Sequence, residues 1–231
     1  MSYNISTMYI FRYFNNKCEC PICKIKQITE RDIVNAYLSE AVMEDLEREK
    51  VNKYGFCNTH YDLLYAGRNK LGVALQISTR LDRLTSILKP ITNVKDSVKQ
   101  AKKLKENTND CIICRKIEFH LKRYFETIPR LYNDDKRFRD EYFNKVNGFC
   151  MPHYIRLLEN GKHAGVHAKE FLNTLYEIQL NSLKNLKKNV DDFTLAFDYR
   201  KEVTQTKESK ESLKTARIKL YGDLPLSPES K

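Results

Sequence analysis

The feature that most constrains the fold of this chain is a pair of cysteine motifs that occurs twice. A Cys-x-x-Cys pair is followed, after a helix-like stretch, by Gly-Phe-Cys-x-x-His, and the same order repeats about ninety residues later. The eight motif positions are Cys20, Cys23, Cys57 and His60 in the first copy and Cys111, Cys114, Cys150 and His153 in the second. Because duplication at a fixed offset indicates repeated structural units, the sequence predicts two pseudo-equivalent halves.

These residue types are the preferred ligands of zinc. A zinc ion takes four tetrahedral ligands, and three thiolates with one imidazole close its coordination sphere, which is typical of structural rather than catalytic sites. We therefore expect two zinc ions per chain, each stapling one half. In chain order, the first site would contain Cys20, Cys23, Cys57 and His60, and the second would contain Cys111, Cys114, Cys150 and His153. The glycines before each Cys-x-x-His pair, Gly55 and Gly148, suit a chain that ends one helix and begins the next.

Other uses of the cysteines stay open at this stage. A Cys-x-x-Cys pair can be redox-active, although thioredoxin-like sites accompany a βαβ pattern that this sequence does not show. Iron–sulfur clusters are also held by cysteine, but they generally take four thiolates. Reduced structural cysteines are the remaining alternative.

The rest of the sequence predicts an all-α fold, a bundle of helices. Seven Gly and six Pro in 231 residues are few for a loop-rich or all-β chain. Apolar residues recur at helical spacing. The clearest stripes are Val34, Leu38, Ala41, Val42 and Leu46, expected in one helix; Ala74, Ile77, Leu81, Leu84 and Leu88; and Ile117, Leu121, Phe125 and Ile128. We expect these stripes to pack in the core.

The sequence divides into four predicted segments. Residues 1–94 and 110–190 are the two zinc-binding helical repeats. Residues 95–109 between them are polar and lysine-rich, which predicts a linker or a surface helix. Residues 191–231 form a C-terminal extension, and its tail from Leu224 has a composition typical of disorder.

The chain is basic: 41 Lys and Arg against 30 Asp and Glu give a formal charge of +11. This excess is compatible with a nucleic-acid or acidic protein partner. No uninterrupted apolar run approaches the roughly 18 residues of a membrane-spanning helix. Since no targeting segment is visible either, we expect a cytoplasmic protein, where clustered cysteines stay reduced and available to a metal.

One cysteine and three histidines lie outside the repeated motifs. Cys18 is the odd seventh cysteine, and we expect it to be a spectator thiol. His163 and His167 lie four residues apart and could share a metal, but an exposed or capping pair is the simpler expectation. His120 has no evident partner in the sequence.

The doubled motifs, together with Phe197-Asp198-Tyr199-Arg200 near the end, resemble a family of uncharacterised bacterial proteins with a domain of unknown function. The resemblance covers about residues 18 to 200. Some members carry an automatic label as substrate-binding proteins of ABC transporters. The resemblance implies no established activity.

Three functional hypotheses follow. The first is a non-enzymatic, zinc-stabilised helical scaffold that binds a protein or nucleic acid through a basic face. The second is a thiol-based sensor of metal or redox state. The third is an enzyme with a groove between the halves, for which the sequence offers no recognisable nucleophile–base pair or phosphate loop.

Overall fold

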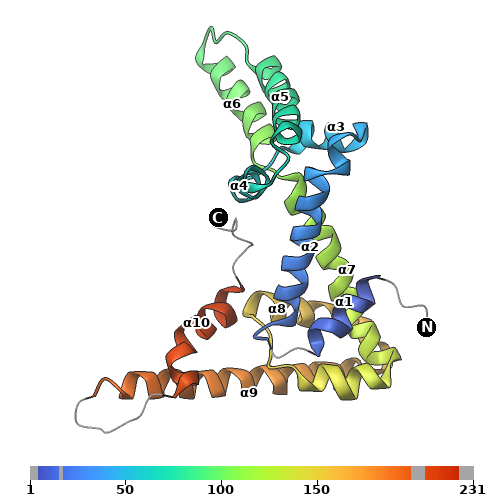
Figure 1. Ribbon diagram of the computed structural model, residues 1–231, viewed down its shortest axis with the longest axis vertical. Helices are drawn as coiled ribbons and strands as arrows, with labels where there is room; N and C mark the ends of the chain where they lie inside the picture. Colours follow the sequence, from blue (N-terminus) through green and yellow to red (C-terminus); the bar gives the residue numbers. More distant parts are fainter. Residues whose placement is uncertain (1–4, 16–17, 199–205, 224–231) are drawn as a thin grey trace. The chain divides into compact units, whose positions relative to one another are not determined.

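The computed structural model describes residues 5–15, 18–198 and 206–223. Over these ranges the chain forms ten α-helices and no strand, which confirms the predicted all-α class (Figure 1). The α-helices are α1 (Ile5–Phe14), α2 (Pro21–Leu38), α3 (Asp45–Tyr54), α4 (Asn58–Ala66), α5 (Lys70–Ile87), α6 (Val94–Thr108), α7 (Ile112–Asp134), α8 (Met151–Asn160), α9 (Ala168–Leu195) and α10 (Lys207–Tyr221). The short helical turns are η1 (Glu40–Val42), η2 (Phe138–Tyr142), η3 (Phe143–Lys145) and η4 (Gly161–His167). No helix in the described ranges combines the length and apolar character needed to cross a bilayer.

The chain folds into two compact units that do not follow chain order. Unit 1 is made of the described parts of residues 1–27 and 121–225. Unit 2, within the described chain, is made of residues 28–120. The boundaries fall inside α2 and inside α7, so each unit draws residues from both copies of the repeated motif.

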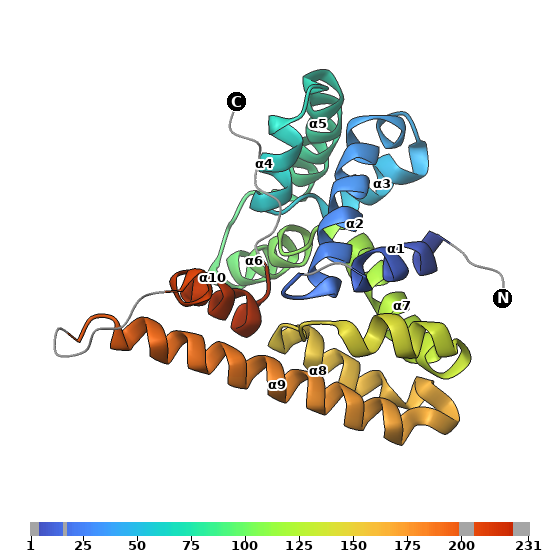
Figure 2. The same cartoon turned by 60° about the horizontal axis from the view of Figure 1, so that its bottom comes forward.

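Unit 1 is organised around the long helix α9, against which α10 and η4 pack (Figure 2). Its core is aromatic. The ring of Phe143 lies 5.1 Å from that of Phe171 and 6.1 Å from those of Phe14 and Phe149, measured between centroids. Each of these rings is almost wholly buried, and burial of such large apolar surfaces is the main stabilising term for this unit.

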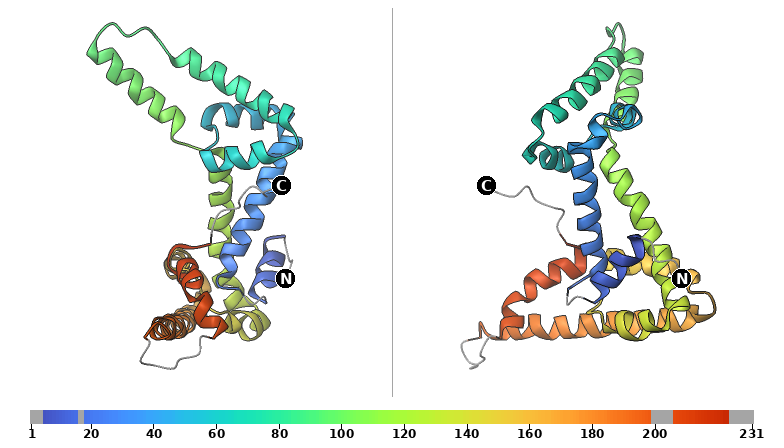
Figure 3. Two further views of the ribbon diagram at one scale, coloured as in Figure 1. Left: turned by 60° about the vertical axis from the view of Figure 1, so that its left-hand side comes forward. Right: turned by 45° about the vertical axis from the view of Figure 1, so that its right-hand side comes forward.

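Unit 2 contains a hairpin of α5 and α6, which lie side by side and run in opposite directions (Figure 3). Helix α3 packs against both of them, and α4 packs against α5. The lysine-rich segment predicted as a linker or surface helix forms α6, which has no buried residue. Helix α6 is therefore a surface helix, held to the unit through α3 and α5.

The first predicted stripe does not form one helix. Helix α2 ends at Leu38, the chain turns through η1, and α3 begins at Asp45. Ala41 and Val42 are buried in η1, while Leu46 is 71% exposed. The helical spacing of the apolar residues continues through η1, although the chain turns there. Periodicity alone therefore predicts a continuous helix.

The second stripe does form a helix, α5, but the expected face is the wrong one. Leu81 and Leu88 are each 54% exposed, whereas Gln76 and Arg80 are 1% and 7% exposed. The polar side chains are buried because they bond to backbone carbonyls: Gln76 donates to Tyr37 O at 3.0 Å. The carboxamide nitrogen of Gln76 also donates to Gly72 O at 3.1 Å, whereas its Oε1 has no hydrogen-bond partner among the described residues. Burial of this polar face leaves part of the apolar stripe facing solvent.

The third stripe is confirmed. Ile117, Leu121, Phe125 and Ile128 are all buried along one side of α7. The helix continues past Pro129, which lies inside it. Helix α10, by contrast, follows no apolar stripe recognised in the sequence; Thr206 begins it by accepting a hydrogen bond from the Ser209 N–H. The predicted disordered tail from Leu224 lies outside the described residues.

Candidate metal centres

The eight predicted ligands form two clusters of four, but not the sets that chain order predicted. Cluster A contains Cys20, Cys23, Cys150 and His153, and cluster B contains Cys57, His60, Cys111 and Cys114. The Cys-x-x-Cys pair of each copy therefore meets the Cys-x-x-His pair of the other copy, and the predicted grouping is wrong. Helix α2 has 18 residues and α7 has 23. At 1.5 Å per residue, about 27 Å and 34 Å, each helix leads the chain away from its own cysteine pair before the histidine pair begins.

Each cluster is built from the first turns of two helices. In cluster A, Cys20 immediately precedes α2, and Cys150 is the N-cap residue of α8. Cys23 and His153 lie three residues further along these two helices. Cluster B repeats this arrangement with Cys111 before α7 and Cys57 before α4. The partial positive charge at a helix N-terminus favours thiolates, so both clusters are placed where anionic sulfur is stabilised.

Two glycines make the approach to the histidine pairs possible. Gly55 has φ +70° and Gly148 has φ +97°, values that side-chain-bearing residues rarely adopt. Gly55 ends α3, as its position in the sequence predicted, and its carbonyl accepts the N–H of Ile112 at 3.0 Å. This bond ties the turn before Cys57 to the start of α7, so the two ligand pairs of cluster B are joined through backbone.

The distances within cluster A suit four ligands around one ion. The Nδ1 atom of His153 lies 3.5 Å from the sulfurs of both Cys20 and Cys23. The sulfurs of Cys23 and Cys150 are 3.7 Å apart. All four residues are buried.

Cluster B has nearly the same dimensions. The Nδ1 atom of His60 lies 3.1 Å from Cys57 Sγ and 3.4 Å from the sulfurs of Cys111 and Cys114. The sulfurs of Cys57 and Cys114 are 3.8 Å apart. Metal–sulfur bonds of about 2.3 Å and metal–nitrogen bonds of about 2.1 Å give tetrahedral edges of about 3.8 Å and 3.6 Å. The separations given for both clusters lie within about 0.5 Å of these edges, the shortest being that between Cys57 and His60, so each cluster could hold one metal ion.

In both clusters, burial and the close approach of the ligand side chains shift the pKa values of those side chains. Burial opposes a charge on His60, but hydrogen bonds with Cys111 and Glu30 raise the pKa of His60 to about 10. Burial likewise works against a Cys111 thiolate, yet the bond from His60 lowers the pKa of Cys111 to about 6. In cluster A, burial raises the pKa of Cys20, whereas hydrogen bonds from Cys150 and Cys20 lower that of Cys23. Each cluster thus holds a stabilised thiolate, and a bound cation would displace the remaining thiol protons.

Glu30 is a supporting residue that the motif pattern does not reveal. Its Oε1 atom lies 3.0 Å from His60 Nε2, on the side of the ring opposite the sulfurs. Both side chains are buried. A carboxylate on the distal nitrogen orients a ligating imidazole and increases its basicity, as in many metal sites. Nothing in the spacing of the cysteines points to a residue of α2 as this partner.

Lys219 of α10 holds together the segments that lead to cluster A. Its ammonium donates to the carbonyl oxygens of Glu19 at 2.6 Å and Asn147 at 2.7 Å, just before the Cys-x-x-Cys and Gly-Phe-Cys turns. Gln179 of α9 adds two 3.0 Å bonds, one to each backbone group of Phe149. Lys219 is 2% exposed. Its charge is therefore satisfied by the two carbonyl oxygens and by the Glu19 carboxylate at 3.4 Å.

Arg80 of α5 has the equivalent role for cluster B. Its guanidinium donates to the carbonyl oxygens of Asn52, Lys53 and Asn107, in the segments that precede Gly55 and Cys111. Arg80 lies in the first copy, whereas Lys219 lies in the C-terminal extension, outside both copies. The sequence carries no signal for either residue, because each is an ordinary charged position on a helix until the fold buries it.

The other candidates lie outside the clusters. Cys18 Sγ is 3.9 Å from the carbonyl of Tyr13 and belongs to neither set. His167 Nδ1 pairs with Glu170 at 2.8 Å, and among the described residues neither His163 nor His167 joins a potential metal-binding group. Of the Phe-Asp-Tyr-Arg run, Tyr199 and Arg200 lie outside the described residues.

Comparison with known protein families gives one finding. The model of a family of unknown function matches residues 1–227, nearly the whole chain. The chain belongs to the family DUF6062. The match confirms the resemblance to an uncharacterised domain family. Comparison of this DUF6062 chain with curated proteins and with solved structures gave no match in either case.

Proposed function

We propose that each cluster binds one zinc ion in a structural role, and that the protein is a zinc-stabilised helical scaffold for a macromolecular partner. The observation that carries this proposal is the pair of complete Cys3His sets whose donor atoms already lie at tetrahedral spacing. Such a set leaves no coordination position for water or substrate, which disfavours a catalytic metal. Each ion would fix two helix N-termini that are distant in sequence, so metal binding would contribute directly to folding.

Removal of the metal tests the structural role. Structural zinc in small domains contributes roughly 10 kcal/mol or more to folding at neutral pH. We expect a strong chelator to lower the melting temperature and the helical circular dichroism of the purified chain together, and added zinc to restore both. A chain that loses its zinc yet keeps its melting temperature and helicity would contradict the structural role.

The α5–α6 hairpin of unit 2 is the surface we assign to the partner. We call it the hairpin surface, and it combines apolar and basic side chains. Its exposed apolar residues are Leu75, Leu81, Leu88, Ile91, Val94 and Val98, and the lysines of α6 are Lys95, Lys99, Lys102, Lys103 and Lys105. Several exposed apolar side chains on one helical hairpin are typical of a protein interaction site, and the lysines add complementarity to an acidic surface.

A lysine-variant series tests this surface. We expect the Lys99→Gln/Lys102→Gln/Lys103→Gln variant to lose partner binding, because it removes three of the five lysine charges of the hairpin surface. The matched control, Lys162→Gln/Lys169→Gln/Lys184→Gln, removes the same charge from exposed positions of unit 1. Loss of binding in both variants would show that only net charge matters.

Two readouts separate the classes of partner. Fluorescence anisotropy with single- and double-stranded oligonucleotides tests nucleic acid, whose binding weakens steeply with salt. A photo-crosslinking residue at Val98 tests a protein partner, provided that unlabelled wild type competes and the lysine variant does not. Absence of salt-dependent oligonucleotide binding would remove nucleic acid, and absence of a competed crosslink would remove a protein partner at this surface.

Cluster B supports a second candidate, thiol-based sensing. Cys114 is exposed and Cys57 is half-buried, whereas the four residues of cluster A are buried. Accessible thiolates are the ones that oxidise, so we expect mild peroxide to release one zinc ion per chain, from cluster B, if sensing is the function. Retention of both ions under these conditions would count against it.

A further inference from the structure

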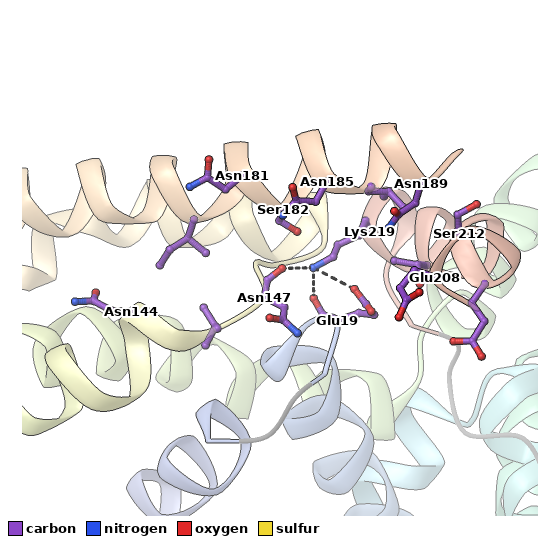
Figure 4. A pocket seen from close by; sticks show the side chains of 15 residues that line it. Glu19, Asn144, Asn147, Asn181, Ser182, Asn185, Asn189, Glu208, Ser212 and Lys219 are labelled. Atoms are coloured by element: carbon purple, nitrogen blue, oxygen red, sulfur yellow. Dashed lines mark hydrogen bonds and ion pairs between the residues drawn. The ribbon is translucent and has the colours of Figure 1, made fainter. Parts of the chain in front are cut away.

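Unit 1 contains a polar groove that the metal centres do not explain. It has a volume of about 440 Å³ and lies between α9, α10 and the segment 144–147 (Figure 4). Three asparagines, Asn181, Asn185 and Asn189, follow one another along α9 at intervals of four residues and line one wall. Glu208 and Glu211 of α10 also line the groove.

Four polar side chains of this groove, Ser212 and the three asparagines, form no hydrogen bond within the described chain. Ser212 is 1% exposed, lines the groove, and its hydroxyl has no hydrogen-bond partner among the described residues. The carboxamides of the three asparagines likewise have no hydrogen bond within the described chain. A buried hydroxyl without a partner is destabilising, so a ligand that bonded it would recover that free energy.

The charges of the described lining residues disfavour an anionic ligand. Among the described residues of the lining, Lys219 is the one cation, and its ammonium is already used by the two carbonyls and the carboxylate described above. Glu208 and Glu211 form no ion pair within the described chain. Over the described lining residues, three carboxylates, Glu19 included, and one ammonium give a net charge of −2, in a protein whose total is +11.

We infer that this groove binds a linear aliphatic polyamine. Successive asparagines four residues apart are about 6 Å apart along the helix, a separation comparable with that of two ammonium groups on a four-carbon chain. The carboxamide oxygens and the two glutamates accept hydrogen bonds from the ammonium groups. Ile178, Leu186 and Val146 line the same groove and contact the methylene segments. None of the described lining residues is aromatic, which disfavours sugars and nucleobases because these ligands are commonly recognised by stacking.

Calorimetric titration of the zinc-loaded full chain with spermidine tests this assignment. We expect saturable binding of one spermidine per chain, and at least tenfold weaker binding to Glu208→Gln/Glu211→Gln, because that variant removes the unpaired carboxylates. The matched control is Glu49→Gln/Glu159→Gln, which changes the net charge equally at exposed positions outside the groove. We expect its affinity to stay within about twofold of wild type.

Three further measurements test which features of the ligand and the groove matter. The variant Asn185→Leu removes one carboxamide without a change in charge, and we expect it to weaken spermidine binding. Propylamine, which carries a single amine, should bind neither wild type nor the variants saturably. Magnesium ions at equal concentration should not compete if amine geometry is recognised. The proposal is wrong if spermidine shows no saturable binding, if both double variants weaken it equally, or if magnesium displaces it. Zinc content and helicity measured on each variant separate these outcomes from a failure of the metal centres.

Discussion

The crossed ligand sets make a prediction that only this arrangement satisfies. The variant Cys20→Ser/Cys150→Ser removes two ligands from cluster A and leaves cluster B complete. Its counterpart, Cys20→Ser/Cys57→Ser, removes one ligand from each cluster. Under the grouping in chain order, these two variants would exchange their effects.

The size of the effect follows from the four-ligand geometry. If a site worth about 10 kcal/mol is shared equally by its ligands, each ligand contributes about 2.5 kcal/mol. Loss of one ligand then weakens zinc binding by roughly 70-fold, and loss of two weakens it by several thousandfold. We therefore choose a competing chelator whose affinity for zinc lies between that of a complete site and that of a site lacking one ligand. Such a chelator removes zinc from every damaged site and leaves it in every complete one.

Zinc per chain after this challenge is measured by inductively coupled plasma mass spectrometry. We expect two ions in wild type, one in Cys20→Ser/Cys150→Ser and none in Cys20→Ser/Cys57→Ser. Circular dichroism serves as the control for folding. One ion in the second variant and none in the first would refute the crossed sets and restore the order of the sequence.

Three further predictions concern residues around the clusters. Glu30→Gln should lower zinc affinity of cluster B by about 10- to 100-fold, because it weakens the orientation of His60, and chelator titration should then show two release phases instead of one. Gly148→Ala should reduce the free energy of unfolding by about 2–4 kcal/mol, since it places a Cβ at positive φ and 2.7 Å from Ser182; Ser182→Gly should recover part of this loss in thermal melts. Lys219→Met should cost about 3 kcal/mol, because two carbonyls lose a buried charged donor, and unchanged melting would contradict that bridging role.

The sequence predicted the helical class and brought all eight cluster residues forward, because ligand spacing and apolar periodicity are local properties. It did not predict which pairs meet. That depends on the length and direction of α2 and α7, and a motif offset carries no information about either. The regular duplication favoured pairing within each copy, and the fold instead joins the Cys-x-x-Cys of one copy to the Cys-x-x-His of the other.

Buried polar residues account for the other differences. Arg80 and Gln76 occupy the inner face of α5 because backbone carbonyls receive their hydrogen bonds, so Leu81 and Leu88 face outward. Periodicity detects an amphipathic helix but not the satisfaction of its polar face. Lys219 was concealed in the same way, within the predicted C-terminal extension of residues 191–231.

Metal analysis of the chain, purified without added metal or chelator, tests the central claim most directly. The measurement combines elemental analysis with an absorption spectrum of the same sample. Two zinc ions per chain in a colourless solution are the predicted result, since both Cys3His clusters are complete within the described chain. Iron with broad visible absorption, or a metal-free chain with freely titrating thiols, would contradict the assignment of two structural zinc sites.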